Sequence, residues 1–90
     1  MLPGYNHNLN VDGVVFHVQT EDRETNSARY IETQVFVEGA IIHVEKNSYP
    51  ANNVGNNRDE IIGLMQNQHK SVLKKLSQKL IPGMERYLRS

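Results

Sequence analysis

The sequence predicts an α+β domain in which a four-stranded antiparallel sheet, made of two hairpins, carries one long C-terminal helix on one face. Apolar and polar residues alternate with a period of two over residues 5–46, and the apolar period lengthens to about 3.6 over residues 58–80. An acidic residue followed by Gly interrupts each alternating half, at Asp12-Gly13 and at Glu38-Gly39. Such pairs are typical of tight hairpin turns. The 90 residues therefore form a single domain with the order strand, strand, strand, strand, helix.

The two residues at each predicted turn indicate which strands form each hairpin. Asp12-Gly13 joins the alternating runs 5–11 and 14–19, and both of its residues tolerate the positive φ of a type I′ turn. Glu38-Gly39 joins runs 30–37 and 40–46 in the same way, although Glu is a weaker turn residue than Asp. We expect the polar stretch 21–28 to be an exposed loop between the hairpins. The sequence leaves open whether the hairpins pair through their second and third strands or through their first and fourth.

The C-terminal third predicts a helix with clear boundaries. Residues 47–57 are rich in Asn, with Pro and Gly, and are expected to form a connector. Asn57 is the expected N-cap and Glu60, three residues later, completes a capping box. The helix is predicted over residues 58–80, and Pro82-Gly83 ends it. The short tail 81–90 is expected to add one more turn, with Met84 and Leu88 on one side.

The alternation also predicts the core. The expected buried face of the sheet carries Leu9, Val11, Val14, Phe16, Val18, Ile31, Val35, Val37, Ile42 and Val44. The expected apolar stripe of the helix carries Ile61, Ile62, Met65, His69, Val72, Leu73, Leu76 and Leu80. His7 lies on the buried face of the sheet and is able to approach His69, where a histidine filling space at the edge of the core is the favoured interpretation.

Composition excludes several classes of function. With no Cys, the chain has no disulfide, no Cys-ligated metal and no thiol nucleophile. The formal net charge is zero, but residues 1–57 hold three basic and seven acidic side chains, whereas residues 58–90 hold seven basic and three acidic ones. We expect no nucleic-acid binding, because the lysines 70, 74, 75 and 79 spread over a solvated helix face without interleaved aromatic residues. The chain has no signal-like start and no long apolar segment, so we expect a cytoplasmic protein without a membrane partner.

The face of the sheet turned away from the helix gives the first functional hypothesis. If the strands form a simple meander, Phe36 opposes Ile41 and Val15 lies level with them, which makes an apolar row where the surface should be wet. Such a row favours contact with a protein partner or with a second copy of the chain. The alternative is the ordinary scatter of apolar residues on a surface. The interface residues predicted in this way are Val15, Phe36, Ile41, His17, Gln34 and His43.

Polar rows on the same face give the second hypothesis, a site that binds a metal or a small polar ligand, or a hydrolytic site with His17 or Glu32 as the acid/base. The same register sets Gln34 opposite His43 and Glu32 opposite Glu45, and a like-charge pair across strands invites a cation. The candidate ligands are Asn6, Asn8, His17, Gln19, Glu32, Gln34, His43 and Glu45. A solvated polar face remains the favoured interpretation, and no cofactor is predicted.

Catalytic motifs are absent from the sequence. No Ser lies in a nucleophile-elbow motif, and Val54-Gly55-Asn56-Asn57 lacks the Lys and the second Gly of a phosphate loop. We therefore expect a non-enzymatic interaction module that uses the outer sheet face or an edge strand.

Several blocks of the chain resemble a known family. They are Gly4-Tyr5-Asn6-His7-Asn8, Val15-Phe16-His17-Val18-Gln19-Thr20-Glu21-Asp22, Ile31-Glu32-Thr33-Gln34-Val35-Phe36, Ser48-Tyr49, and Leu64-Met65-Gln66-Asn67-Gln68-His69-Lys70. In this order they resemble a small, largely uncharacterised family of bacterial proteins of the deltaproteobacterial type, marked by NHN, FHVQTED and MQxQHK blocks. The resemblance implies a bacterial cytoplasmic protein and implies no activity.

Overall fold

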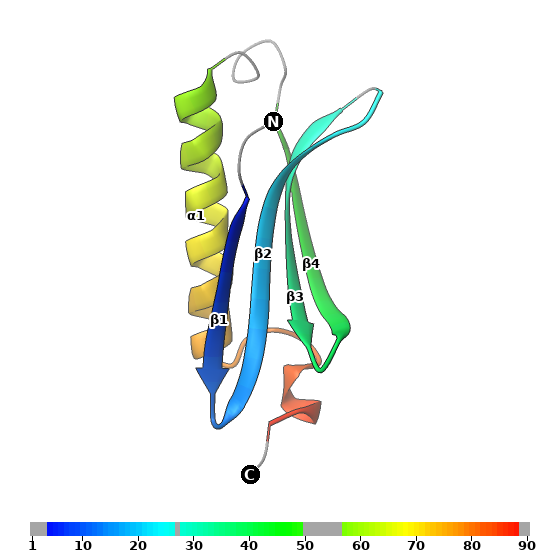
Figure 1. Cartoon of the computed structure of the whole chain (residues 1–90), viewed down its shortest axis with the longest axis vertical. Coiled ribbons are helices and arrows are strands. Elements are labelled where there is room, and N and C mark those ends of the chain that lie inside the picture. Colours follow the sequence, from blue (N-terminus) through cyan, green and yellow to red (C-terminus); the bar gives the residue numbers. More distant parts are fainter. Residues whose placement is uncertain (1–3, 27, 50–56, 89–90) are drawn as a thin grey trace.

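The fold is an open four-stranded antiparallel sheet with one helix against it, which confirms the predicted α+β class (Figure 1). The computed structural model describes residues 4–26, 28–49 and 57–88. Its elements are β1 (Tyr5–Val11), β2 (Val14–Glu24), β3 (Arg29–Val37), β4 (Ala40–Tyr49), α1 (Arg58–Ser77) and the 3₁₀ turn η1 (Met84–Arg86). The strand order is β1-β2-β3-β4, so the hairpins meet through β2 and β3.

Both hairpin turns have the backbone that their sequences predict. Asp12 and Gly13 have φ values of 52° and 85°, and Glu38 and Gly39 have values of 50° and 80°. Positive φ at both central residues is the mark of a type I′ turn, whose twist matches that of the flanking strands. In the first hairpin the predicted register is confirmed, with Val11 opposite Val14 and Asn8 opposite His17.

The strands run further than predicted at the end of the sheet away from the turns. β2 continues to Glu24 and β3 begins at Arg29, so the first half of the expected loop 21–28 is paired strand. β4 continues to Tyr49, which is buried, so the expected connector begins later than residue 47. Polar contacts hold this end, because the Asp22 carboxylate accepts hydrogen bonds from both Arg29 and Tyr49. The rest of the expected connector, 50–56, lies outside the described residues.

A β-bulge in β4 makes the predicted register of the second hairpin wrong. Phe36 opposes Ile41 as expected, but the next pair is Val35 with His43, so Ile42 is an extra residue on β4. From there on, Gln34 opposes Val44 and Glu32 opposes Lys46. Because side chains alternate between faces, one extra residue exchanges the two faces for the remainder of the strand.

The exchange moves side chains to the opposite sides of the sheet from those predicted. His43 and Glu45 share the helix-side face with their partners Val35 and Thr33. Val44, expected in the core, lies on the outer face and is 41 % exposed. The extra residue Ile42 packs against the apolar core and thereby takes up the space that Val44 was expected to fill.

The helix begins as predicted and ends one turn early. The Asn57 side chain accepts a hydrogen bond from the backbone N–H of Glu60 at 3.2 Å, and its own amide donates to the Glu60 carboxylate. At the other end, Lys79 has a φ of 61°, and the backbone N–H of Leu80 bonds to the carbonyl of Lys75. This left-handed residue ends the helix. Leu80, expected in the buried stripe, is therefore 62 % exposed.

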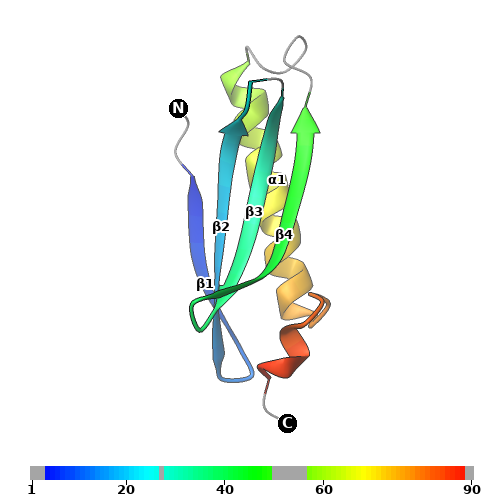
Figure 2. The same ribbon diagram turned by 90° about the vertical axis from the view of Figure 1, so that its right-hand side faces the viewer.

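The chain after α1 closes the core at the turn end of the sheet. Figure 1 shows η1 below the β3–β4 hairpin, with the linking segment running there from the end of α1, and Figure 2 shows η1 below that end of the helix. Ile81 and Met84 are buried against β-strand residues, among them Val11 and Val37. The expected extra turn in the tail is present as η1.

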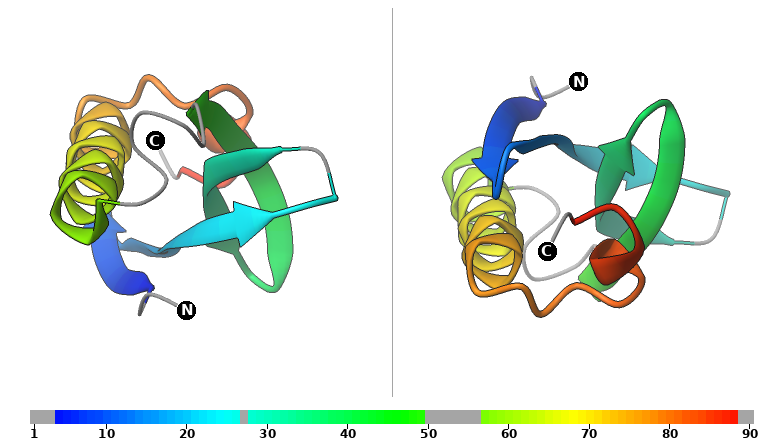
Figure 3. Two further views of the ribbon diagram at one scale, coloured as in Figure 1. Left: turned by 90° about the horizontal axis from the view of Figure 1, so that it is seen from above. Right: turned by 90° about the horizontal axis from the view of Figure 1, so that it is seen from below.

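The helix does not cover the whole sheet. Its backbone lies closest to β1, β2 and β3, whereas it reaches β4 through the side chains of Gln68 and Lys75. The views along the molecule show β1 beside α1 with β4 on the far side (Figure 3). Two apolar clusters fill the space between helix and sheet, one around Phe16 and Leu76 and the other around Ile31 and Met65. Buried polar side chains lie in the same layer.

Candidate functional site

The outer face of the sheet carries an apolar patch centred on Phe36. On this strand level Phe36 has His17 of β2 on one side and Ile41 of β4 on the other, and the His17 ring centroid is 6.0 Å from that of Phe36. Val44 continues the patch along β4, and Val15 lies two residues from His17 on the same face of β2. Val15, Ile41 and Val44 are 53 %, 51 % and 41 % exposed. We call Val15, Phe36, Ile41 and Val44 the outer patch.

Most of the predicted interface residues come together here. Val15, Phe36, Ile41, His17 and Gln34 share the outer face, although His17 and not Val15 is the residue directly opposite Phe36. His43 does not belong to this surface, because the bulge turns it towards the helix. Val44 was missed. The doublet Ile41-Ile42, two apolar residues in succession within an alternating strand, is the sequence signal that indicates a bulge.

Polar side chains surround the outer patch and satisfy one another. The Asn8 side-chain oxygen lies 2.6 Å from Nδ1 of His17. Glu32 is opposite Glu21 and not Glu45, and Arg23 forms ion pairs with both carboxylates, at 3.1 Å and 3.2 Å. Lys46 adds a contact with Glu32 at 3.7 Å. The like-charge pair is thus neutralised by the protein itself and does not call for a cation.

The candidate ligand set is divided between two faces. Asn6, Asn8, His17, Gln19, Glu32 and Gln34 lie on the outer face, whereas His43 and Glu45 lie on the helix side. Within residues 4–26, 28–49 and 57–88, no three or more His, Cys, Asp or Glu side chains are grouped so as to hold a metal ion. The arrangement that would join His17 with His43 is therefore not formed.

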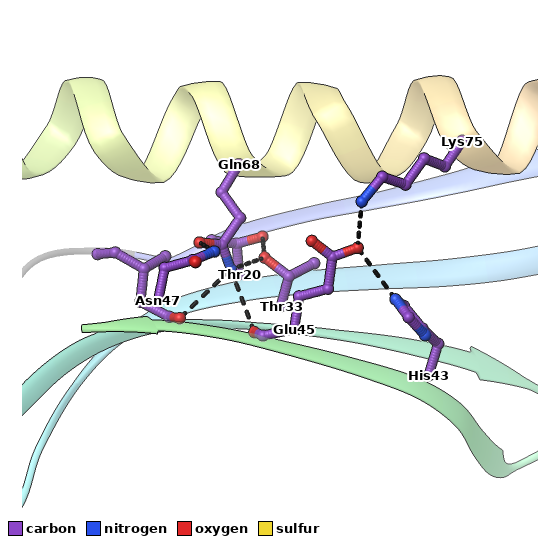
Figure 4. Close-up of polar contacts among 8 residues, drawn as sticks. Thr20, Thr33, His43, Glu45, Asn47, Gln68 and Lys75 are labelled. Atoms are coloured by element: carbon purple, nitrogen blue, oxygen red, sulfur yellow. Dashed lines mark hydrogen bonds and ion pairs between the residues drawn. The ribbon is translucent and has the colours of Figure 1, made fainter. Parts of the chain in front are cut away.

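The helix side of the sheet holds a second polar feature, a belt of buried side chains (Figure 4). Thr20 and Thr33 are fully buried on neighbouring strands, with their hydroxyl oxygens 2.7 Å apart. Gln68 and His69 of α1 contact these two threonines from the helix side of the sheet. Gln68 donates to the Thr33 hydroxyl at 3.0 Å, and Nδ1 of His69 lies 2.7 Å from the Thr20 hydroxyl. We call Thr20, Thr33, Gln68 and His69 the polar belt.

Glu45 extends this polar layer towards the open side of the sheet. Its carboxylate accepts hydrogen bonds from Lys75 at 2.8 Å and from His43 at 3.0 Å (Figure 4). Burial by itself would raise the pKa of the Glu45 carboxyl, but these two bonds outweigh it and the pKa lies below its usual value. The carboxylate therefore stays charged and links β4 to α1.

Tyr49 anchors the C-terminal end of β4. Its hydroxyl donates to Asp22, which also pairs with Arg29 at 3.0 Å, and the Arg29 guanidinium lies 5.4 Å from the centroid of the Tyr49 ring. Burial and the hydrogen bond to Asp22 raise the pKa of Tyr49 to about 12. Tyr49 is thus a protonated structural donor.

The expected approach of His7 to His69 is confirmed. Nδ1 of His7 lies 2.6 Å from Nε2 of His69, and the ring centroids are 4.8 Å apart. The other belt members were missed. Thr20 and Thr33 occupy helix-side positions in the period-two alternation, and Gln68 is adjacent to His69 on the helix. These positions in the pattern were the sequence signal that could have identified them.

Comparison of the chain with protein-family models, with curated proteins and with solved structures gives no match. The family resemblance noted from the sequence blocks therefore stays a prediction. In the part of the chain that the structure describes, no helix is both long enough and apolar enough to cross a membrane.

Proposed function

We propose that this chain is a small protein-interaction module whose contact surface is the outer patch. The observation that carries the proposal is the exposure of three apolar side chains, Val15, Ile41 and Val44, around Phe36 on one sheet face. Contiguous apolar surface of this kind, ringed by polar groups, is typical of contact sites. Among the described elements, α1 lies on the other side of the sheet (Figure 1).

The occupant that we favour is a second copy of the chain. The patch reaches the edge of the sheet, because Ile41 and Val44 belong to β4, which has β3 as its only neighbour among the described strands. An edge strand offers unpaired backbone groups to another strand. Two copies related by a two-fold axis beside this edge would pack their outer patches against each other, which is the self-complementary contact of a symmetric dimer.

Sedimentation equilibrium over a range of protein concentrations tests this proposal. We expect the wild type to form dimers as the concentration rises, and Val44→Glu to remain monomeric because the new charge would be buried in the contact. Leu80→Glu is the matched control, since it makes the same kind of change at an exposed apolar residue after the helix, and it should associate like the wild type.

A wild type that stays monomeric at every concentration would overturn the choice of a second copy. Equal behaviour of Val44→Glu and the wild type would remove the outer patch as the contact surface. Heteronuclear spectra of all three proteins confirm that each variant keeps the fold before its mass is compared.

A further inference from the structure

A second surface feature lies between β1 and α1, away from the outer patch. It is a hollow of about 330 Å³, open to solvent and lined by Tyr5, His7, Gln66, His69, Lys70 and Leu73. No Asp or Glu belongs to this lining, and Lys70 supplies a positive charge. His69 is 3 % exposed and forms the buried part of the wall. The volume is at the small end of the range for ligand pockets.

The direction of the hydrogen bonds behind this wall is fixed at Gln68. The side-chain nitrogen of Gln68 lies within 3.3 Å of the carbonyl oxygen of Ile31 and 3.2 Å of that of Glu45. Carbonyl oxygens only accept, so the NH₂ group of Gln68 has to face them. Asn47 donates to the Gln68 oxygen at 2.8 Å, in agreement with this orientation. This NH₂ group has two hydrogens for three oxygens, so the Thr33 hydroxyl, the nearest at 3.0 Å, accepts one of them and the two carbonyls share the other.

The direction passes from Gln68 through the two threonines to His69. The Thr33 oxygen accepts from Gln68, so the Thr33 hydrogen has Thr20 as its acceptor. The Thr20 hydrogen then goes to Nδ1 of His69. If the direction were reversed, Thr33 would accept twice and its own buried hydrogen would have no acceptor among these contacts, which is costly.

This direction sets the tautomers of both histidines. Burial, with a smaller contribution from neighbouring His7, lowers the pKa of His69, so the ring is neutral and carries one hydrogen. With Nδ1 of His69 accepting from Thr20, that hydrogen is on Nε2 and is donated to Nδ1 of His7. Because Nδ1 of His7 accepts this hydrogen bond, the hydrogen of the His7 ring is on Nε2, from which it is able to donate to a ligand.

Tyr5 also has a hydrogen available for donation. Its hydroxyl oxygen accepts from the Gln66 side chain at 3.3 Å, which leaves the hydroxyl hydrogen for another acceptor. The residues that line the hollow thus include three with a donor, the Lys70 ammonium, the His7 Nε2–H and the Tyr5 hydroxyl, and none with a carboxylate. Such a set suits a ligand that only accepts hydrogen bonds and carries negative charge.

We propose that this hollow binds a small oxyanion, a phosphate or carboxylate group, through Lys70, His7 and Tyr5, with the polar belt holding His7 as a donor. The site is separate from the outer patch, so it stands whether or not the chain dimerises. The belt has two roles in this account. It joins the helix to the sheet, and it transmits the orientation of the Gln68 amide to the surface of the hollow.

Nuclear magnetic resonance of the histidine ring nitrogens tests the proposal in two steps. In the free protein, we expect His69 to carry its hydrogen on Nε2 with a bare Nδ1. Titration with inorganic phosphate, and separately with acetate, at constant ionic strength set with chloride, should then shift the His7 and His69 signals in a saturable way. Saturation with either probe supports the site, and the difference between the probes identifies the preferred oxyanion.

A matched pair of variants separates a built site from general charge attraction. Lys70→Gln should weaken the binding by roughly tenfold, the loss of one charge-assisted hydrogen bond. Lys74→Gln removes the same charge one helical turn away, at an exposed lysine outside the lining, and should change the affinity less than about twofold. Amide spectra show that both variants remain folded.

Three results would overturn the proposal. The first is a His69 that carries its hydrogen on Nδ1, because the chain of donors would then run the other way. The second is the absence of a saturable shift with both anions. The third is an equal loss of affinity in Lys70→Gln and Lys74→Gln, which would show non-specific screening.

Discussion

The two hairpins begin with the same device and end with different surfaces. Both turn at an acidic residue followed by Gly, with positive φ at each position. The β1–β2 hairpin keeps a regular register, so its apolar alternation leads directly to burial, whereas the β3–β4 hairpin gains the extra residue Ile42. One insertion directs His43 and Glu45 towards the helix and Val44 towards solvent. Local register, and not composition, thus decides which surface of β4 is available for contact.

The largest predicted effect is a difference in stability between variants on the two faces of the sheet. Phe16 is fully buried beneath the helix, and we expect Phe16→Ala to lower the free energy of unfolding by about 3–5 kcal/mol. Phe36→Ala removes the same side chain from the outer face, where it is only partly buried, and should cost clearly less. Urea unfolding of both variants measures the difference, and equal losses would contradict the assignment of the faces.

The polar belt should act as a coupled unit. We expect Thr33→Val to destabilise the protein by about 1–3 kcal/mol, because it leaves hydrogen-bonding groups of Thr20 and Gln68 buried with one partner fewer. The double variant Thr20→Val, Thr33→Val should cost less than the sum of the two single variants, since part of that loss is shared. Strict additivity in the unfolding free energies would show that the two hydroxyls do not interact.

Deletions in β4 test the bulge itself. Removing Ile42 takes out the extra residue and leaves the pairs of Phe36 with Ile41 and of Val35 with His43 in place. We expect the fold to persist with a loss of about 1 kcal/mol from the partly buried side chain. Deleting Val44 is the control, because it reverses the faces of the residues after it. Hydrogen exchange and unfolding should show a larger loss for the Val44 deletion, and the opposite order would refute the bulge.

Acid should lower the stability of the fold through His69 and Glu45, two titratable residues on the helix side of the sheet. The pKa of His69 is lower in the folded than in the unfolded chain, so its contribution is complete above about pH 6.5 and declines as the pH falls through the lowered value. The lowered pKa of Glu45 acts in the same direction below about pH 4.5. The unfolding midpoint should therefore fall on acidification. His69→Gln should remove the part that begins below about pH 6.5, and an unchanged pH dependence in that variant would contradict this assignment.

The sequence predicted what depends on local pattern and missed what depends on insertion and on buried polar pairing. The fold class, both turns, the Asn57 cap and the approach of His7 to His69 follow from spacing alone. The faces of β4 on which its side chains lie could not be predicted in this way. The period-two pattern assumes strict alternation between faces, and the extra residue Ile42 interrupts it. Thr20, Thr33 and Gln68 were missed because polar residues were assigned to solvent, whereas a pair of neighbouring hydroxyls and an amide satisfy one another inside the core.

The most direct test of the outer patch as a contact surface is the exposure of its methyl groups to a soluble paramagnetic agent at low and at high protein concentration. We expect the methyl signals of Val15, Ile41 and Val44 to broaden strongly in dilute solution and to be protected in concentrated solution. The buried methyls of Val18 and Val35 should be protected in both. Outer-patch methyls that broaden equally at every concentration, or a Val44 that is protected even in dilute solution, would contradict this expectation.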